Sequence, residues 1–123
     1  YYPNGIHLLS HERMYVADEH HHHVRLIDLT SMTEVWKSPA GQLKAACSVH
    51  QVQQGKWKGY LLISDTDNNR VILAEPERWK IIYEISGVHG VMKSVPVFRG
   101  SDQYIQGSRI SEKRKNRQGK SAL

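Results

Sequence analysis

Residues Tyr60 to Glu75 read YLLISDTDNNRVILAE and carry the clearest structural signal in the chain. The first arm, Tyr60 to Ile63, is a short apolar run of residues that suit a pleated, buried strand. Polar residues from Asp65 to Asn69 interrupt this run, and short polar side chains favour chain reversal because they can bond their own backbone. The apolar run resumes from Val71 to Ala74, so the stretch predicts an antiparallel β-hairpin with no helix between Tyr60 and Glu75.

The same pattern occurs earlier, in YVADEHHHHVRLID from Tyr15 to Asp28. Val16-Ala17-Asp18 aligns with Ile63-Ser64-Asp65, and the step from position 16 to position 63 is 47 residues. A hairpin that repeats every 40–50 residues or so is typical of a β-propeller. Short strand-like runs precede and follow each hairpin, so each unit predicts four antiparallel strands, the content of one propeller blade.

The repeat predicts an all-β fold in which residues 1–106 form a β-propeller segment of about two and a half blades. The blades are expected at about 3–38 and 44–86, with a partial third at 87–108, followed by a basic, disordered tail at 109–123. A closed propeller contains about 4–8 blades. The remaining blades would therefore come from a longer chain or from oligomerisation. The absence of an initiator Met favours the longer chain, and a sheet stack that is not a propeller is the structural alternative.

The length of 123 residues allows one modest domain. No apolar run approaches the roughly 20 residues of a membrane-spanning helix, so no membrane span is predicted. The N-terminus has neither the basic start nor the apolar core of a signal peptide. The single cysteine, Cys47, excludes an internal disulfide and favours a reducing compartment such as the cytoplasm.

The formal net charge of +5 is concentrated at one end of the chain. Residues 107–123 hold six Lys or Arg and one Glu, which leaves residues 1–106 with eleven basic and eleven acidic side chains. The run from Ser111 to Lys120 has no apolar periodicity and predicts disorder. Such a segment can bind nucleic acid or another anionic surface. Its removal is expected to leave the thermal unfolding midpoint unchanged.

The second unit resembles the blades of arylsulfotransferase-like propellers. In that family a His near the start of an inner strand precedes a hairpin of the LLISDTDNNRV kind and then an outer strand with Trp or Tyr. The matching residues are His50, Leu61 to Val71, and Trp79 to Ile85. The hairpin is also similar to blades of the NHL-repeat family.

The segment Pro3-Asn4-Gly5-Ile6 is similar to one in six-bladed propellers of the gluconolactonase and paraoxonase type. An Asn of that segment ligates a central divalent cation in those proteins. The resemblance therefore implies Asn4 as a metal ligand and a divalent cation as cofactor.

Three histidines lie early in the successive units. His7, His50 and His89 are separated by 43 and 39 residues, and each is expected on the strand nearest the propeller axis. Equivalent positions in successive blades point at one central channel, where imidazoles could transfer protons or ligate metal. The arylsulfotransferase-like resemblance implies that a central His takes the sulfuryl group, and it carries over best to His50. The alternative is that all three are polar side chains at strand ends that form hydrogen bonds with the backbone or with water.

Other polar residues favour structural roles. His20 to His23 occupy the bend of the first hairpin, where neighbours point to opposite faces and at most alternate residues could share a metal. Asp18 and Asp65 recur where each hairpin turns and are expected to fix the turn. The aromatic residues Trp36, Trp79 and Tyr83 are expected to pack between blades.

Three functions remain open on this evidence. The first is group transfer on a small anionic substrate by channel histidines. The second is a non-catalytic NHL-type segment that binds a protein or nucleic acid. The third is a metal-dependent lactonase or esterase with Asn4 as a ligand. The sequence does not decide whether the chain is an enzyme.

Overall fold

The computed structural model describes residues 3–91, 93–99 and 102–107. These residues form two four-stranded antiparallel sheets and one two-stranded sheet, which confirms the predicted all-β class. The N-terminal sheet has the order β1-β2-β3-β4, the central sheet β5-β6-β7-β8, and the C-terminal hairpin pairs β9 with β10. The strand bounds are β1 Pro3–Leu8, β2 Arg13–Asp18, β3 His23–Asp28, β4 Thr33–Lys37, β5 Ser48–Gln51, β6 Leu61–Asp65, β7 Arg70–Glu75, β8 Lys80–Ser86, β9 Ser94–Arg99 and β10 Asp102–Gly107.

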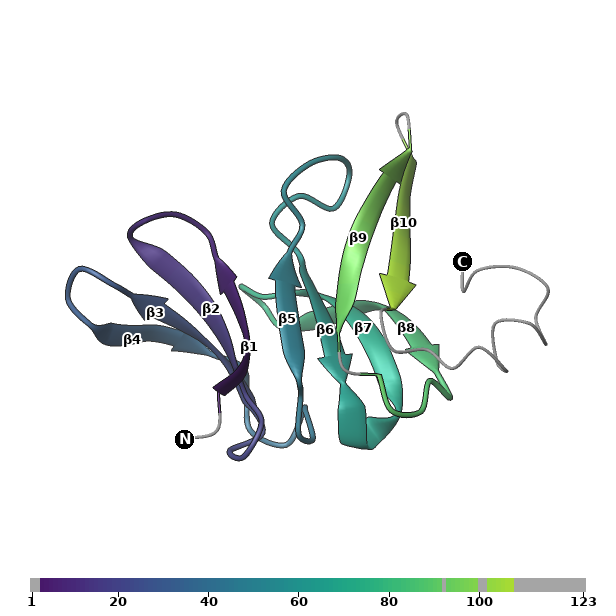
Figure 1. Ribbon diagram of the computed structural model, residues 1–123, viewed down its shortest axis with the longest axis horizontal. Helices are drawn as coiled ribbons and strands as arrows, with labels where there is room; N and C mark the ends of the chain where they lie inside the picture. The colour runs from purple at the N-terminus through teal and green to yellow at the C-terminus, as the bar shows by residue number, and fades with distance from the viewer. Residues whose placement is uncertain (1–2, 92, 100–101, 108–123) are drawn as a thin grey trace.

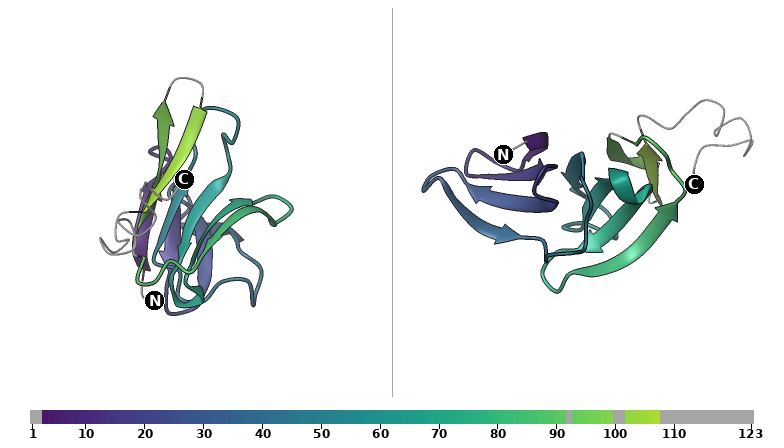
Figure 2. Two further views of the ribbon diagram at one scale, coloured as in Figure 1. Left: turned by 90° about the vertical axis from the view of Figure 1, so that its right-hand side faces the viewer. Right: turned by 90° about the horizontal axis from the view of Figure 1, so that it is seen from below.

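The three sheets follow one another in chain order (Figures 1 and 2). Strands β1 and β2 contact β5, and strands β5 and β6 contact β9, so the first strands of the sheets line up side by side. The outer strands β4 and β8 lie farther from this line (Figure 2). Within the described residues no helix is long and apolar enough to cross a membrane.

The two four-stranded sheets repeat each other residue by residue. Met14 pairs with Ile27 in the first hairpin and Leu61 with Ala74 in the second, at the predicted offset of 47. The pairing of the third and fourth strands slips at the same place in both sheets, after Leu26 and after Leu73. The repeat is therefore a repeat of backbone geometry as well as of apolar pattern.

Left-handed backbone recurs at the same offset. His22 and Asn69, with φ of 60° and 52°, end the two hairpin bends. Met32 and Trp79, with φ of 57° and 52°, precede the two outer strands. Asn adopts this conformation readily, whereas Met and Trp do so at a cost. The turn geometry is thus conserved between the sheets although the side chains differ.

One detail of the predicted hairpin is wrong. No helix was expected between Tyr60 and Glu75, yet Thr66–Asn68 form one turn of 3-10 helix. Asn69 closes this turn by donating its backbone N–H to the Thr66 carbonyl oxygen at 3.0 Å. Because the turn stays within the bend, the two arms keep their antiparallel pairing.

The main apolar core lies between the N-terminal and central sheets. Tyr15, Ala17 and Val24 of the first sheet pack with Leu61 and Ile63 of the second. Two aromatic side chains extend this core at the outer strands, since the rings of Trp36 and Trp79 lie 6.2 Å apart between their centroids. The expectation that Tyr83 also packs between sheets is wrong, because its side chain is 53% exposed.

The link between β5 and β6 is longer than the link between β1 and β2. The link of residues 52–60 is closed by its own hydrogen bonds: Val52 donates to the Tyr60 carbonyl oxygen at 2.9 Å and Gly59 to the Val52 carbonyl oxygen at 2.8 Å. These two hydrogen bonds close the base of the loop and keep β5 and β6 in register.

A chain of buried hydroxyl groups connects the central sheet to β9. Ser48 donates to Ser64 at 2.8 Å, and Ser64 lies 2.9 Å from the hydroxyl of Ser94. All three serines are at most 7% exposed. The predicted tail, residues 109–123, lies outside the described residues.

Candidate functional site

Two of the three predicted channel histidines meet where β1 and β5 lie side by side. The rings of His7 and His50 stack with their centroids 3.9 Å apart and an angle of 11° between their planes. His7 pairs with Tyr15 in the N-terminal sheet and His50 with Leu62 in the central sheet, and these partners are equivalent at the offset of 47. The stacked pair, His7–His50, thus arises because two equivalent positions of the repeat face each other.

Gly5 permits the close approach of the two strands. A Cβ at this position would lie 2.6 Å from the Cys47 carbonyl oxygen and 2.7 Å from the Ser48 Cα. These distances are far below van der Waals contact, and the atoms met belong to the backbone, so the strands themselves would have to shift. A side chain at position 5 would therefore push β1 away from β5, two residues from the stacked pair.

A backbone hydrogen bond fixes the protonation of His7. The Gln51 N–H donates to His7 Nδ1 at 2.7 Å. A ring nitrogen that accepts a hydrogen bond carries no proton, so neutral His7 holds its proton on Nε2. Burial also lowers the pKa of His7. His7 is consequently a neutral ring with one N–H donor directed away from the Gln51 backbone.

His50 is held neutral more strongly. Burial lowers the pKa of His50 most, and repulsion from Lys93 and from His7 when that ring is protonated adds to it, so the pKa falls from its ordinary value to about 4. No described residue forms a hydrogen bond with the His50 ring. At neutral pH the pair therefore offers one N–H donor on His7 and an available nitrogen lone pair on His50.

His89 does not join this pair. It was expected on the strand nearest the axis, but it lies in an exposed turn between β8 and β9. Gly87 and Gly90 flank it with φ of 73° and 68°, so the backbone reverses there and the next strand begins only at Ser94. The expected placement of His89 on a strand is wrong for this reason.

The predicted metal ligand, Asn4, lies in β1, where the structure describes the backbone alone. Within the described part of the chain, no group of three or more His, Cys, Asp or Glu side chains is placed to hold a metal ion.

The histidine run in the first bend has structural partners. His21 contacts the Asp18 carboxylate at 3.1 Å, His22 accepts the Ala45 backbone N–H at 2.9 Å, and His23 contacts the Ser38 carbonyl oxygen at 2.9 Å. The bend is thereby tied to β2 and to the segment that leads into the central sheet.

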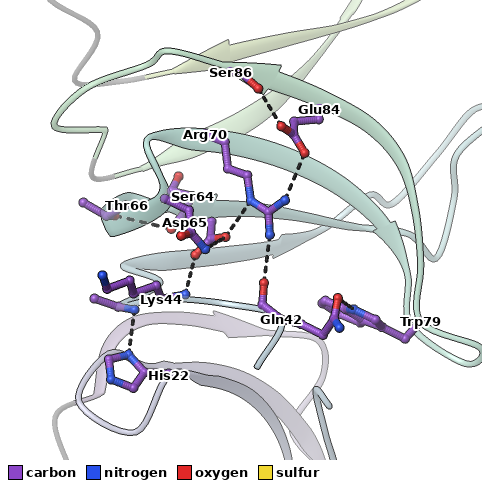
Figure 3. A network of polar contacts seen from close by, with 12 residues as sticks. His22, Gln42, Lys44, Ser64, Asp65, Thr66, Arg70, Trp79, Glu84 and Ser86 are labelled. Carbon is purple, nitrogen blue, oxygen red and sulfur yellow. Dashed lines mark hydrogen bonds and ion pairs between the residues drawn. The ribbon is translucent and has the colours of Figure 1, made fainter. Parts of the chain in front are cut away.

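The partners of the two buried aspartates were not predicted from the sequence. Asp65, fully buried, accepts hydrogen bonds from the Lys44 backbone N–H at 2.7 Å and from Arg70 Nε at 2.7 Å. Arg70 also donates to Glu84 on β8 and to the Gln42 carbonyl oxygen (Figure 3). This ion-pair network crosses three strands and reaches the segment that connects the two sheets.

The N-terminal sheet carries the matching network. Arg25 donates from Nε to Asp18 at 2.8 Å and from Nη1 to Glu34. Burial disfavours the charged Asp18, but hydrogen bonds from His21 and Arg25 outweigh it and lower the pKa of this carboxyl group. The repeat did not predict the two networks, because Arg25 in β3 and Arg70 in β7 stand at different positions of the repeat and each lies within a strand with apolar periodicity.

Comparisons with known protein families, curated proteins and solved structures found no match to this chain.

Proposed function

We propose that this chain is a β-propeller segment in which the stacked pair transfers a group from a small anionic substrate. The observation that carries the proposal is the contact between His7 and His50 at equivalent positions of successive sheets. The order of the sheets, with their first strands side by side, supports a propeller arrangement around those strands. The resemblance to arylsulfotransferase-like blades supports the choice of a sulfate ester as the substrate class.

The protonation of the two rings suits each to a different task. The neutral His50 nitrogen would attack the sulfur of an aryl sulfate, forming an N–S bond while the S–O bond to the aryl group breaks. The electron pair would leave on the aryl oxygen, which takes a proton from solvent. The His7 Nε2–H would donate to a sulfate oxygen, and the positive charge of Lys93 would attract the anion. An acceptor hydroxyl would then displace the histidine nitrogen, receive the sulfuryl group and release its proton to solvent.

Transfer from p-nitrophenyl sulfate to a phenol tests this proposal. His50→Asn should abolish transfer, since Asn has no ring nitrogen to attack, and His7→Asn should weaken it. His89→Asn is the matched control, because His89 is exposed in a turn, and it should leave the rate unchanged. Circular dichroism of each variant would establish that the fold is retained.

A folded His50→Asn variant that still transfers the group would overturn the proposal. A sulfate titration followed by imidazole NMR signals provides a second readout that does not require turnover. Shifts of the His7 and His50 signals are expected, and shifts confined to other histidines would also count against the site.

A second candidate function is favoured by one surface cluster. Trp57, Tyr60 and Tyr83 place their rings edge to face, with centroids 5.3 and 5.4 Å from that of Trp57. The Lys56 ammonium lies 4.9 Å from the Trp57 ring. Aromatic rings beside a cation suit stacked bases of a single-stranded nucleic acid. We propose this binding role as the alternative, and Trp57→Ala should then weaken oligonucleotide binding without affecting sulfuryl transfer.

A further inference from the structure

The N-terminal sheet leaves one of its two faces uncovered. Its front face, with Tyr15 and Ala17, is buried against the central sheet. The opposite face bears a groove of about 460 Å3 lined by apolar side chains that include Val16 and Ile27. At the edges of this groove Ile6 is 62% exposed and Met32 is 74% exposed. We call this surface, residues 6–34 on the side of Val16, the open face.

The central sheet shows what such a face packs against. The strand registers make Ile6 and Val16 of the open face equivalent to Val49 and Ile63 of the central sheet. Val49 and Ile63 are at most 4% exposed, because the front face of the N-terminal sheet covers them. The back of the central sheet is therefore covered, whereas the equivalent surface of the N-terminal sheet, the open face, is not.

The remaining residues of the groove continue this equivalence. Met14 and Ile27 correspond to Leu61 and Ala74, both fully buried in the interface between the sheets. Met32 corresponds to Trp79 at the offset of 47, and both residues have left-handed backbone. The open face is thus shaped as the back of a sheet that receives another sheet.

The charged residues at the groove fit the same interpretation. In the central sheet, Asp65 accepts a backbone N–H from Lys44, and Arg70 donates to the Gln42 carbonyl oxygen. Both contacts come from the segment that arrives from the preceding sheet (Figure 3). On the open face Arg25 is likewise ion-paired, to Asp18 and to Glu34, so covering this face would leave its guanidinium with carboxylate partners.

We propose that the open face binds a second copy of this chain in a head-to-tail contact. The central sheet packs its back on the front of the N-terminal sheet, and the C-terminal hairpin follows the central sheet, since β5 and β6 contact β9. The end of the stack opposite the open face is the C-terminal hairpin, β9 with β10. A second copy would set this hairpin against the open face, which continues the existing order of sheets. The two surfaces in contact differ, so the contact is heterologous and can propagate to further copies.

Sedimentation velocity of the full chain over a wide concentration range tests the contact. The weight-average mass should rise with concentration. Ile6→Glu and Met32→Glu should weaken self-association about tenfold or more, because each sets a charge on an apolar interface. Both side chains are largely exposed in one copy, so these variants should keep the thermal midpoint of the parent. Gln54→Glu is the control, since Gln54 is likewise exposed but lies in the link between β5 and β6, away from the open face.

A photo-reactive amino acid at position 6 identifies the occupant. Cross-links to residues 94–107 of a second copy are expected. Cross-links to residues 6–34 of a second copy would show a two-fold, face-to-face dimer and would overturn the head-to-tail proposal. A monomer at every concentration, or self-association that Ile6→Glu leaves unchanged, would overturn the second copy as the occupant. None of these results depends on sulfuryl transfer.

Discussion

The protonation of His50 links the candidate site to the stability of the fold. The unfolded chain binds a proton to this imidazole near its ordinary pKa of 6.5, whereas the folded chain binds it only near pH 4. Between these values the unfolded state holds more protons, so the stability contributed by neutral His50 is present above pH 6.5 and is lost as the pH falls towards 4. We predict that His50→Asn loses less stability than the parent between pH 7 and pH 4.5. The difference should be about 1 kcal/mol once solvent screening of a partly exposed ring is allowed for. Urea unfolding at the two pH values measures it, and equal losses in both proteins would contradict the low pKa.

The three-strand ion-pair networks act at the scale of the secondary-structure element. Asp65 accepts hydrogen bonds from the side chains of Arg70 and Asn68 and from the Lys44 backbone N–H of the connecting segment. We predict that Asp65→Asn lowers the free energy of unfolding by about 3 kcal/mol, because it removes the buried carboxylate that pairs with Arg70 Nε and leaves only the more exposed Glu84 as its ionic partner. Asp18→Asn is the matched comparison and should cost less, since the Asp18 network faces the open face. Chemical denaturation of both variants gives the two values, and equal costs would show that the connecting segment adds nothing.

The approach of β1 to β5 gives a second prediction at this scale. Gly5→Ala should lower the free energy of unfolding by about 1–3 kcal/mol, because the new Cβ would overlap backbone atoms of Cys47 and Ser48. It should also separate the rings of His7 and His50, which imidazole NMR would detect as lost ring-to-ring contacts. Gly59→Ala is the control: its Cβ would meet nothing within 4 Å, so only the cost of its left-handed backbone applies. Unchanged histidine signals in Gly5→Ala would show that the strands can adjust.

At the scale of the whole molecule, the charge is carried by a segment outside the described sheets. Residues 111–123 contain five Lys or Arg and one Glu, with no apolar periodicity. We predict that deleting them leaves the thermal unfolding midpoint unchanged and removes salt-dependent retention on a polyanion column. Differential scanning calorimetry and chromatography of the truncated chain measure the two effects. A lower midpoint would show that the segment packs on the fold.

The repeat at an offset of 47 residues, which spans both four-stranded sheets, also explains which features could be predicted from the sequence. Alternating apolar runs at the offset of 47 predicted both hairpins, because Val16 and Ile63 sit at matched positions in matched strands. The spacing of His7 and His50 predicted equivalent positions, but their stacking depends on Gly5 and on a Gln51 N–H that is distant in sequence. His89 was misplaced because the glycines beside it turn the chain. The contacts of Arg70 were not predictable, since they join three strands and a connecting segment that no local pattern relates.

The self-closed link of residues 52–60 gives this scaffold a natural point for grafting. The corresponding link in the N-terminal sheet spans only residues 9–12, yet both lead into hairpins of the same register. Length has therefore already varied here without disturbing either sheet, and the hydrogen bonds between Val52, Gly59 and Tyr60 shield the strands from whatever lies above them. A foreign peptide placed between Gln54 and Lys58 would be displayed at the tip of a rigid stem. The scaffold could then present an epitope or a binding loop as a designed antibody mimic does.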